Sequence, residues 1–115
     1  MDKNSEHELI DIASALEKTG GDKEFLAELL SMYVEDFEDK YTELEHAVKQ
    51  KKTDRILQLA HSLKGASANL GLFPLQEAFF RLELSGRKND TAEAEKILPL
   101  LSQEFDRLKV FLEKK

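Results

Sequence analysis

The sequence predicts an all-α fold, an antiparallel four-helix bundle with an additional short N-terminal helix. Residues that favour helices (Leu, Glu, Lys and Ala) dominate the 115 positions, and no segment alternates apolar and polar side chains as a strand would. Apolar residues instead recur every three or four positions in five segments joined by short polar stretches. We expect a single domain over residues 1–115, because a chain of this length hides roughly two-thirds of its unfolded surface.

The first two predicted helices are separated by Gly20 and Gly21. The short N-terminal helix ends before these glycines and has five apolar residues: Leu9, Ile10, Ile12, Ala13 and Leu16. Asp22 is placed to cap the long helix that follows, because its carboxylate can accept from the first free backbone N–H groups. The apolar residues of the long helix are Leu26, Leu30, Tyr33, Phe37, Tyr41, Leu44 and Val48.

The third predicted helix begins near Thr53, which is able to cap it, and ends at Gly71. Its apolar residues are Ile56, Leu59, Leu63, Ala66 and Leu70. Pro74 suits the first turn of a fourth helix, which Gly86 closes. The apolar residues of the fourth helix are Leu75, Phe79 and Leu82.

The last predicted helix follows the polar stretch "GRKND". Asp90 and Glu93 have the spacing of a capping box, and Pro99 should kink this helix or divide it. Its apolar residues are Ile97, Leu101, Phe105, Leu108 and Leu112.

Composition narrows the classes of function. The formal charge of -6 is spread over most of the helical segments, which argues against a duplex nucleic acid as partner. The absence of cysteine excludes disulfides and thiolate metal sites. The apolar runs fall far short of the ~20 residues that cross a bilayer, and no signal-peptide pattern is present. We therefore expect a cytoplasmic protein with no membrane contact.

His61 is predicted to face away from the core. With about 100° of rotation per residue and Ile56 at zero, the other apolar residues of its helix fall between about 280° and 340°, and His61 near 140°. Leu57, Gly65 and Ala68 share the face of His61. Glycine within a helix costs roughly 1 kcal/mol against alanine, and close approach of another molecule would explain Gly65.

An exposed imidazole with a cation one helical turn away suits phosphoryl transfer. A neutral imidazole is a nitrogen nucleophile at cellular pH and can form covalent intermediates. Lys64 lies about 5–6 Å from His61 between Cβ atoms, so its ammonium can reach negative oxygens attached to the ring. These residues favour a phosphohistidine at His61.

The stretch "AHSLKGASANLG", residues 60–71, closely resembles the motif of histidine-containing phosphotransfer (HPt) domains. That motif is H-x-L-K-G with a further glycine ten residues after the histidine, and His61, Leu63, Lys64, Gly65 and Gly71 match it. "GGDKEFLAELLSMYVEDF" and "LPLLSQEFDRLKVFLEK" look like the family's second and last helices, so the resemblance covers about residues 19–115.

The resemblance implies that His61 accepts a phosphoryl group on Nε2 from one receiver-domain aspartate and passes it to another, within a multistep two-component phosphorelay. Lys64 would steady the phosphoryl oxygens, and Gly65 would let the receiver approach a docking surface that includes Leu57 and Ala68. The partners would be response-regulator receiver domains and a hybrid sensor histidine kinase. The chain would be a monomeric carrier without a cofactor, and not an autonomous ATP-dependent kinase.

The resemblance also singles out Glu83, which lies 22 residues after His61. Family members often have a polar side chain on the following helix that binds the other ring nitrogen, and Glu83 falls at the matching place. A carboxylate that accepts from Nδ1–H would leave Nε2 free. The alternative is that Glu83 is a solvated helix residue. Arg81 could add positive charge near the phosphoryl group, although a surface role suits it better.

Three other readings stay open from the sequence. The chain could be the phosphoacceptor domain of a chemotaxis-type histidine kinase, which an attached ATP-binding domain phosphorylates. It could be a di-iron helical bundle, since Glu43 and His46 have the Glu-x-x-His spacing. Such a site needs the motif twice, and it occurs once. It could also be a non-catalytic interaction module, which would leave Gly65 unexplained.

Overall fold

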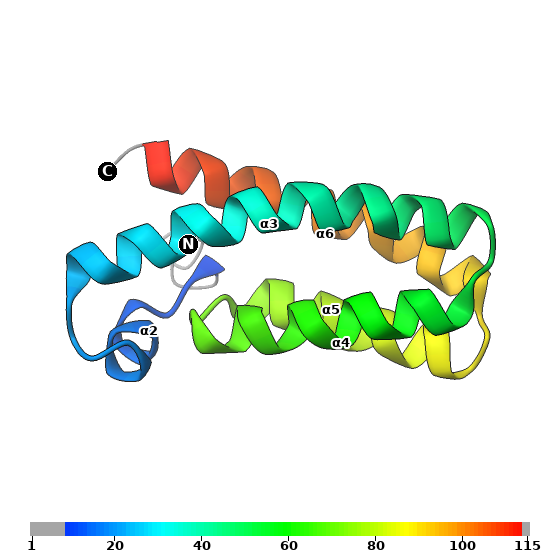
Figure 1. Cartoon of the computed structure of the whole chain (residues 1–115), viewed down its shortest axis with the longest axis horizontal. Coiled ribbons are helices and arrows are strands. Elements are labelled where there is room, and N and C mark those ends of the chain that lie inside the picture. The colour runs from blue at the N-terminus through cyan, green and yellow to red at the C-terminus, as the bar shows by residue number, and fades with distance from the viewer. Residues whose placement is uncertain (1–8, 114–115) are drawn as a thin grey trace, which may run out of the picture.

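The computed structural model describes residues 9–113, and within that range it contains five complete helices and no strand (Figure 1). The helices are α2 (Ile12–Lys18), α3 (Lys23–Lys49), α4 (Thr53–Asn69), α5 (Phe73–Arg87) and α6 (Thr91–Glu113). The prediction of an all-α fold is confirmed. Residues 1–8 and 114–115 of the predicted domain lie outside the described range.

Four of these helices form the predicted antiparallel bundle. Helices α3, α4, α5 and α6 follow one another up and down, with α3 beside α6 and α4 beside α5 (Figure 1). Helix α2 covers the end of the bundle where α4 finishes, and a backbone hydrogen bond of 2.8 Å joins Asp11 N–H to the carbonyl of Gly71 there. None of the helices in residues 9–113 is long and apolar enough to cross a membrane.

Phe37 is the centre of the core. Its ring stacks on Phe105 of α6 with centroids 4.0 Å apart and meets Phe79 of α5 edge-on at 5.8 Å. All three rings are buried, and such pairs add about 0.5–1.5 kcal/mol beyond the burial of their area. Aromatic packing therefore joins three of the four bundle helices at one point.

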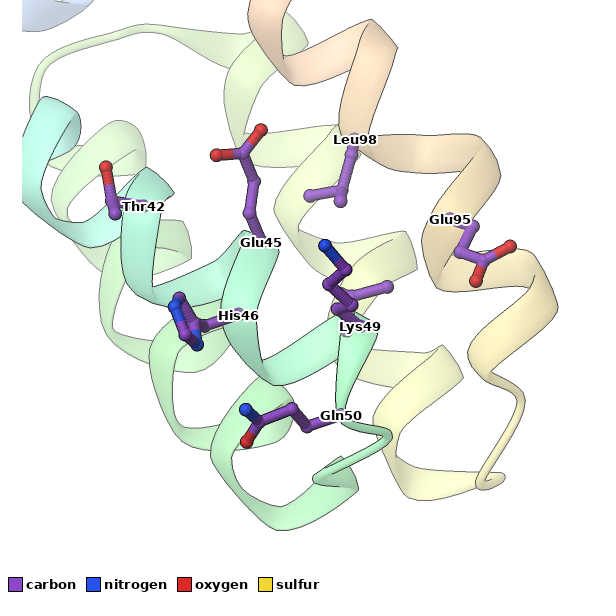
Figure 2. Close-up of a pocket in the computed structure, with 8 residues that line it drawn as sticks. Thr42, Glu45, His46, Lys49, Gln50, Glu95 and Leu98 are labelled. Atoms are coloured by element: carbon purple, nitrogen blue, oxygen red, sulfur yellow. The ribbon is translucent and has the colours of Figure 1, made fainter.

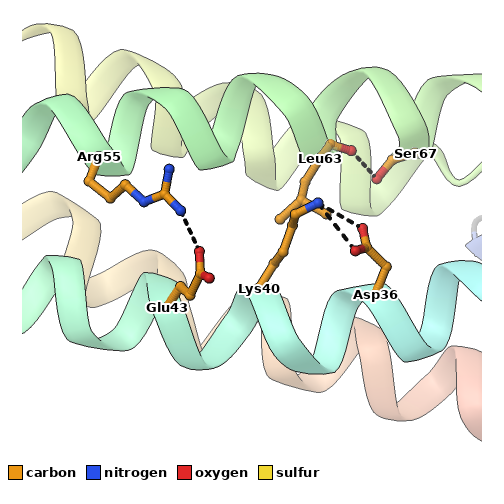
Figure 3. A network of polar contacts seen from close by, with 6 residues as sticks. All are labelled: Asp36, Lys40, Glu43, Arg55, Leu63 and Ser67. Atoms are coloured by element: carbon orange, nitrogen blue, oxygen red, sulfur yellow. Dashed lines mark hydrogen bonds and ion pairs between the residues drawn. The ribbon is translucent and has the colours of Figure 1, made fainter.

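A buried polar contact fixes α4 against α3. Ser67 donates its hydroxyl hydrogen to the carbonyl of Leu63 at 2.8 Å (Figure 3), so the Tyr33 hydroxyl, 2.6 Å away, donates to Ser67. Burial raises the pKa of Tyr33 far above its ordinary value, which keeps this hydrogen in place. An ion pair of 2.6 Å between Arg55 and Glu43 crosses the same two helices nearer their other end (Figure 3).

The predicted helix ends are confirmed at Asp22, Gly71 and Asp90. Asp22 accepts from the N–H groups of Glu24 and Phe25 at 3.0 and 3.1 Å. Gly71 follows the C-cap residue of α4, Leu70, and has a left-handed φ of +69°. Asp90 accepts from the N–H of Glu93 at 3.0 Å, but the reciprocal half of the capping box is missing because Asp90 N–H is bound to a carbonyl of α5.

The N-terminal helix differs from its prediction. Asp11 interrupts the expected segment by accepting from Ser14 N–H, so α2 begins only at Ile12. Ile12 and Ala13 consequently face solvent, whereas Ala15, absent from the predicted apolar face, is fully buried.

Two further predictions about helix ends, at Thr53 and Gly86, were wrong. Thr53 is the first residue of α4 rather than its cap, and its hydroxyl donates to Asn89 at 2.8 Å. Of the two alternatives predicted for Pro99, the division of the helix is excluded, because α6 runs unbroken from Thr91 to Glu113. Gly86 does not close α5; it lies inside the last turn, where a Cβ atom would come within 3.1–3.3 Å of the backbone of Leu57 and the backbone carbonyl oxygen of Thr53. Its smallness serves the close approach of α4 and α5.

We predict opposite effects for alanine at two helical glycines. Gly86→Ala should destabilise the fold by about 1–3 kcal/mol, because the added carbon pushes α5 away from α4. Gly65→Ala, where a Cβ meets nothing within 4 Å beyond its own helix, should stabilise it by up to about 1 kcal/mol through helix propensity. Urea unfolding followed by circular dichroism measures both. Equal stability of the two variants would contradict the packing role of Gly86.

Candidate functional site

His61 projects outward from the middle of α4. Its side chain is 69% exposed, as the helical projection predicts, and its Nδ1 lies 3.0 Å from Oε2 of Glu83 on α5. A carboxylate only accepts, so this hydrogen bond requires the hydrogen of a neutral ring on Nδ1. The lone pair of Nε2 is then free and accessible.

Glu83 is the buried member of this pair. Its side chain is 3% exposed, so the structure excludes the reading of Glu83 as a solvated helix residue. Besides His61, two cations approach the carboxylate: Lys64 Nζ lies 2.7 Å from Oε1, and Arg87 donates to Oε2 at 3.1 Å. The Lys64 contact is a short ion pair without aligned hydrogen-bond geometry, since Oε1 has no hydrogen-bond partner within residues 9–113.

Two opposing effects act on the pKa of Glu83. Burial raises the pKa, whereas the ion pair with Lys64 and the hydrogen bonds from His61 and Arg87 lower it. The lowering effects outweigh burial, so the pKa of Glu83 lies below its ordinary value of 4.5. The carboxylate is therefore ionised at neutral pH and presents a full negative charge to the imidazole.

Lys64 is held between two groups of α5. Its ammonium pairs with Glu83 on one side and lies 5.3 Å from the centroid of the Phe80 ring on the other. Phe80 is 42% exposed, so part of its ring surface is open to solvent. The side chain of Lys64 itself is 27% exposed, so its ammonium is still within reach of solvent.

Sequence reasoning missed Phe80 and Arg87. A helical projection of α5 would have found them, because Phe80, Glu83 and Arg87 have spacings of three and four and share one face. The antiparallel pairing of α4 and α5 then places that face beside His61.

The other residues predicted for the site lie around His61 on α4. Gly65 is exposed, and Leu57 and Ala68 are half-buried. The carbonyl of Ala68 accepts from the ammonium of Lys18 at 3.1 Å, which ties α2 to this end of α4. Arg81 pairs with Glu93 at 3.3 Å rather than with Glu83, in agreement with a surface role.

Glu43 and His46, the Glu-x-x-His pair of α3, have different neighbours from each other. His46 lines an open pocket together with Glu45 and Lys49 of α3 and Glu95 of α6 (Figure 2). Glu43 is engaged by Arg55 instead. Within residues 9–113, no three His, Asp or Glu side chains gather as a metal ion would require.

Comparison with known proteins finds one matching family and a similar solved structure. The family model of the Hpt domain matches residues 28–110, which include all the site residues named above except Lys18. Among solved structures, the chain is similar to histidine-containing phosphotransfer protein B from Pseudomonas aeruginosa, with a TM-score of 0.84. The two are 23% identical over 92% of each chain, and at this identity the likeness shows a shared fold. Comparison with curated protein sequences finds no match.

We predict a pH-dependent stability difference between the wild type and Glu83→Gln. Because the folded-state pKa of Glu83 is lowered, its ionised form contributes stability that is complete above the unfolded pKa and is lost as pH falls through the folded pKa. Glu83→Gln should cost about 1–3 kcal/mol at pH 7, because it removes the charge that three donors face. The gap should shrink as pH falls below 4.5.

Urea unfolding of both proteins at pH 7, 5 and 3.5 measures this gap. Other carboxyl groups titrate in both chains and cancel in the difference. A gap that stays constant over this range would contradict an ionised, stabilising Glu83.

Proposed function

The chain belongs to the Hpt domain family, and on that premise we propose that His61 carries a phosphoryl group on Nε2 between receiver-domain aspartates. HPt proteins work in phosphorelays with receiver domains and kinases, so the family sets the class of function. The observation that supports His61 most strongly is its 3.0 Å contact with the buried Glu83, which directs the free lone pair of an exposed ring toward solvent.

The transfer step follows from this arrangement. Nε2 attacks the phosphorus of a receiver's aspartyl phosphate, an N–P bond forms, and the P–O bond to the aspartate breaks, so that aspartate leaves as a carboxylate. The hydrogen stays on Nδ1, and the ring, now substituted on both nitrogens, becomes positively charged. The negative charge of Glu83, 3.0 Å from Nδ1, stabilises the ring charge as it develops. The reverse step loads the next receiver.

Lys64 supplies the charge that the phosphoryl oxygens need. Its ammonium sits on a flexible stem and its side chain is 27% exposed, so it can turn from Glu83 toward a group bound on His61. A phosphoryl group on Nε2 would offer it several negative oxygens in place of one shared carboxylate.

The surface around His61 is where we expect receiver domains to dock. Gly65 leaves open space beside the imidazole, and Leu57, Ala68 and Phe80 provide apolar area on either side. Such an interface should be small and short-lived, because a carrier must release one partner before it meets the next. A monomeric carrier in the cytoplasm, serving response regulators and a hybrid sensor histidine kinase, fits this role.

We predict that His61→Gln abolishes phosphoryl uptake. After incubation with a receiver domain phosphorylated on its aspartate, the wild type should acquire an acid-labile, alkali-stable label, because phosphohistidine has that stability profile. The matched control is His46→Gln, which changes another exposed histidine and should leave labelling intact. Label that persists in His61→Gln would refute the assignment of His61.

We predict that Gly65→Arg blocks docking. The arginine would occupy the open space beside His61, so transfer should slow by about tenfold or more, equivalent to ~1.4 kcal/mol. Gly65→Ala, which adds one carbon, should lose far less. Thr42→Arg adds the same charge at an exposed site on α3 and should transfer at the wild-type rate. Circular dichroism checks that each variant is folded, and wild-type transfer by Gly65→Arg would contradict this docking surface.

A further inference from the structure

Arg87 is the part of the site that neither the motif nor the proposed transfer step uses. It lies four residues after Glu83 on α5, and its guanidinium donates to Oε2 of Glu83 at 3.1 Å. His61 Nδ1 binds the same oxygen, while Lys64 approaches the other one. The buried carboxylate thus has one ring donor and two cations around it.

The two cations reach Glu83 from opposite directions along the helices. Helices α4 and α5 are antiparallel, and Gly86 packs on Leu57, so Arg87 reaches Glu83 from the side of the start of α4, whereas Lys64 comes from the turn after His61. Arg87 therefore stands on the Nδ1 side of the imidazole, and its partner oxygen is the one that orients the ring.

Phosphoryl transfer changes which negative groups Lys64 and Arg87 have to neutralise. When Lys64 turns to the phosphoryl oxygens, it leaves Oε1 of Glu83, whose side chain is only 3% exposed and so receives little help from water. A buried charge that loses its partner is strongly disfavoured and tends to take up a proton. A neutral Glu83 would no longer stabilise the positive ring.

We propose that Arg87 is a positioning residue that remains on Glu83 as its counter-ion while Lys64 moves to the phosphoryl group. This inference rests on the proposed function of His61. Arg87 keeps the carboxylate ionised and its Oε2 aligned with Nδ1, so the two cations divide the work between the orienting carboxylate and the transferred group. Arg87 acts through Glu83 and need not touch the phosphoryl group.

The test compares two arginines of α5. Arg87→Ala should slow transfer from a phosphorylated receiver and shorten the lifetime of the phosphohistidine, each by about three- to tenfold. Arg81→Ala removes an exposed arginine from the same helix whose carboxylate partner, Glu93, lies outside the site, and should match the wild type. Arg87→Lys keeps the charge at the same position and should recover most of the loss.

A double-mutant cycle tests whether Arg87 acts through Glu83. In a Glu83→Gln background there is no carboxylate charge to hold, so Arg87→Ala should cause no further loss. An undiminished effect of Arg87→Ala in that background would overturn the proposal, and so would a wild-type rate for Arg87→Ala alone. If the wild-type protein takes up no label, the proposed function of His61 is refuted instead. Failure of the Arg87 proposal and failure of the proposed function therefore give different results.

Discussion

The buried carboxylate of Glu83 is the constraint on which the rest of the site depends. A charge that is 3% exposed is stable only among partners, and α4 and α5 supply those partners from both sides: His61 and Lys64 from one helix and Arg87 from the other. The carboxylate thus sets the hydrogen position on the imidazole and stores a negative charge next to it. One acidic residue in the α4–α5 interface thus gives a surface histidine one defined hydrogen position.

The fold holds this interface at a short and fixed distance. Gly86, three residues after Glu83, lets α5 approach the backbone of α4 so closely that no side chain fits between them. Toward α3, the buried hydroxyls of Tyr33 and Ser67 hold α4 in place. The ring of Phe37 then joins α3 to α5 and α6. Helix α4 therefore has little freedom to slide or rotate, and the orientation of its histidine follows from the core.

Much of this arrangement could be predicted from the sequence, because helical periodicity is a local property. The five helices and the outward direction of His61 follow from spacings of three and four residues along single segments, and the cap at Asp22 follows from its carboxylate at the start of one of them. A helical projection of α5 places Phe80 and Arg87 on the face of Glu83, but the residues of α4 that this face meets, and the close approach at Gly86, could not be predicted in the same way. They depend on which turn of α5 lies beside which turn of α4, and that register is set by packing between helices rather than by either sequence alone.

The exposure of His61 also determines how long a phosphoryl group would stay on its ring. His61 is 69% exposed, so a phosphoryl group on Nε2 would stand in bulk water between encounters rather than behind a wall of side chains. Its storage time would then be set by the hydrolytic stability of the N–P bond and by its ionic neighbours, not by sequestration. Spontaneous loss to water would compete directly with delivery, so we expect signal strength to depend on the concentration and encounter rate of the receiving partner.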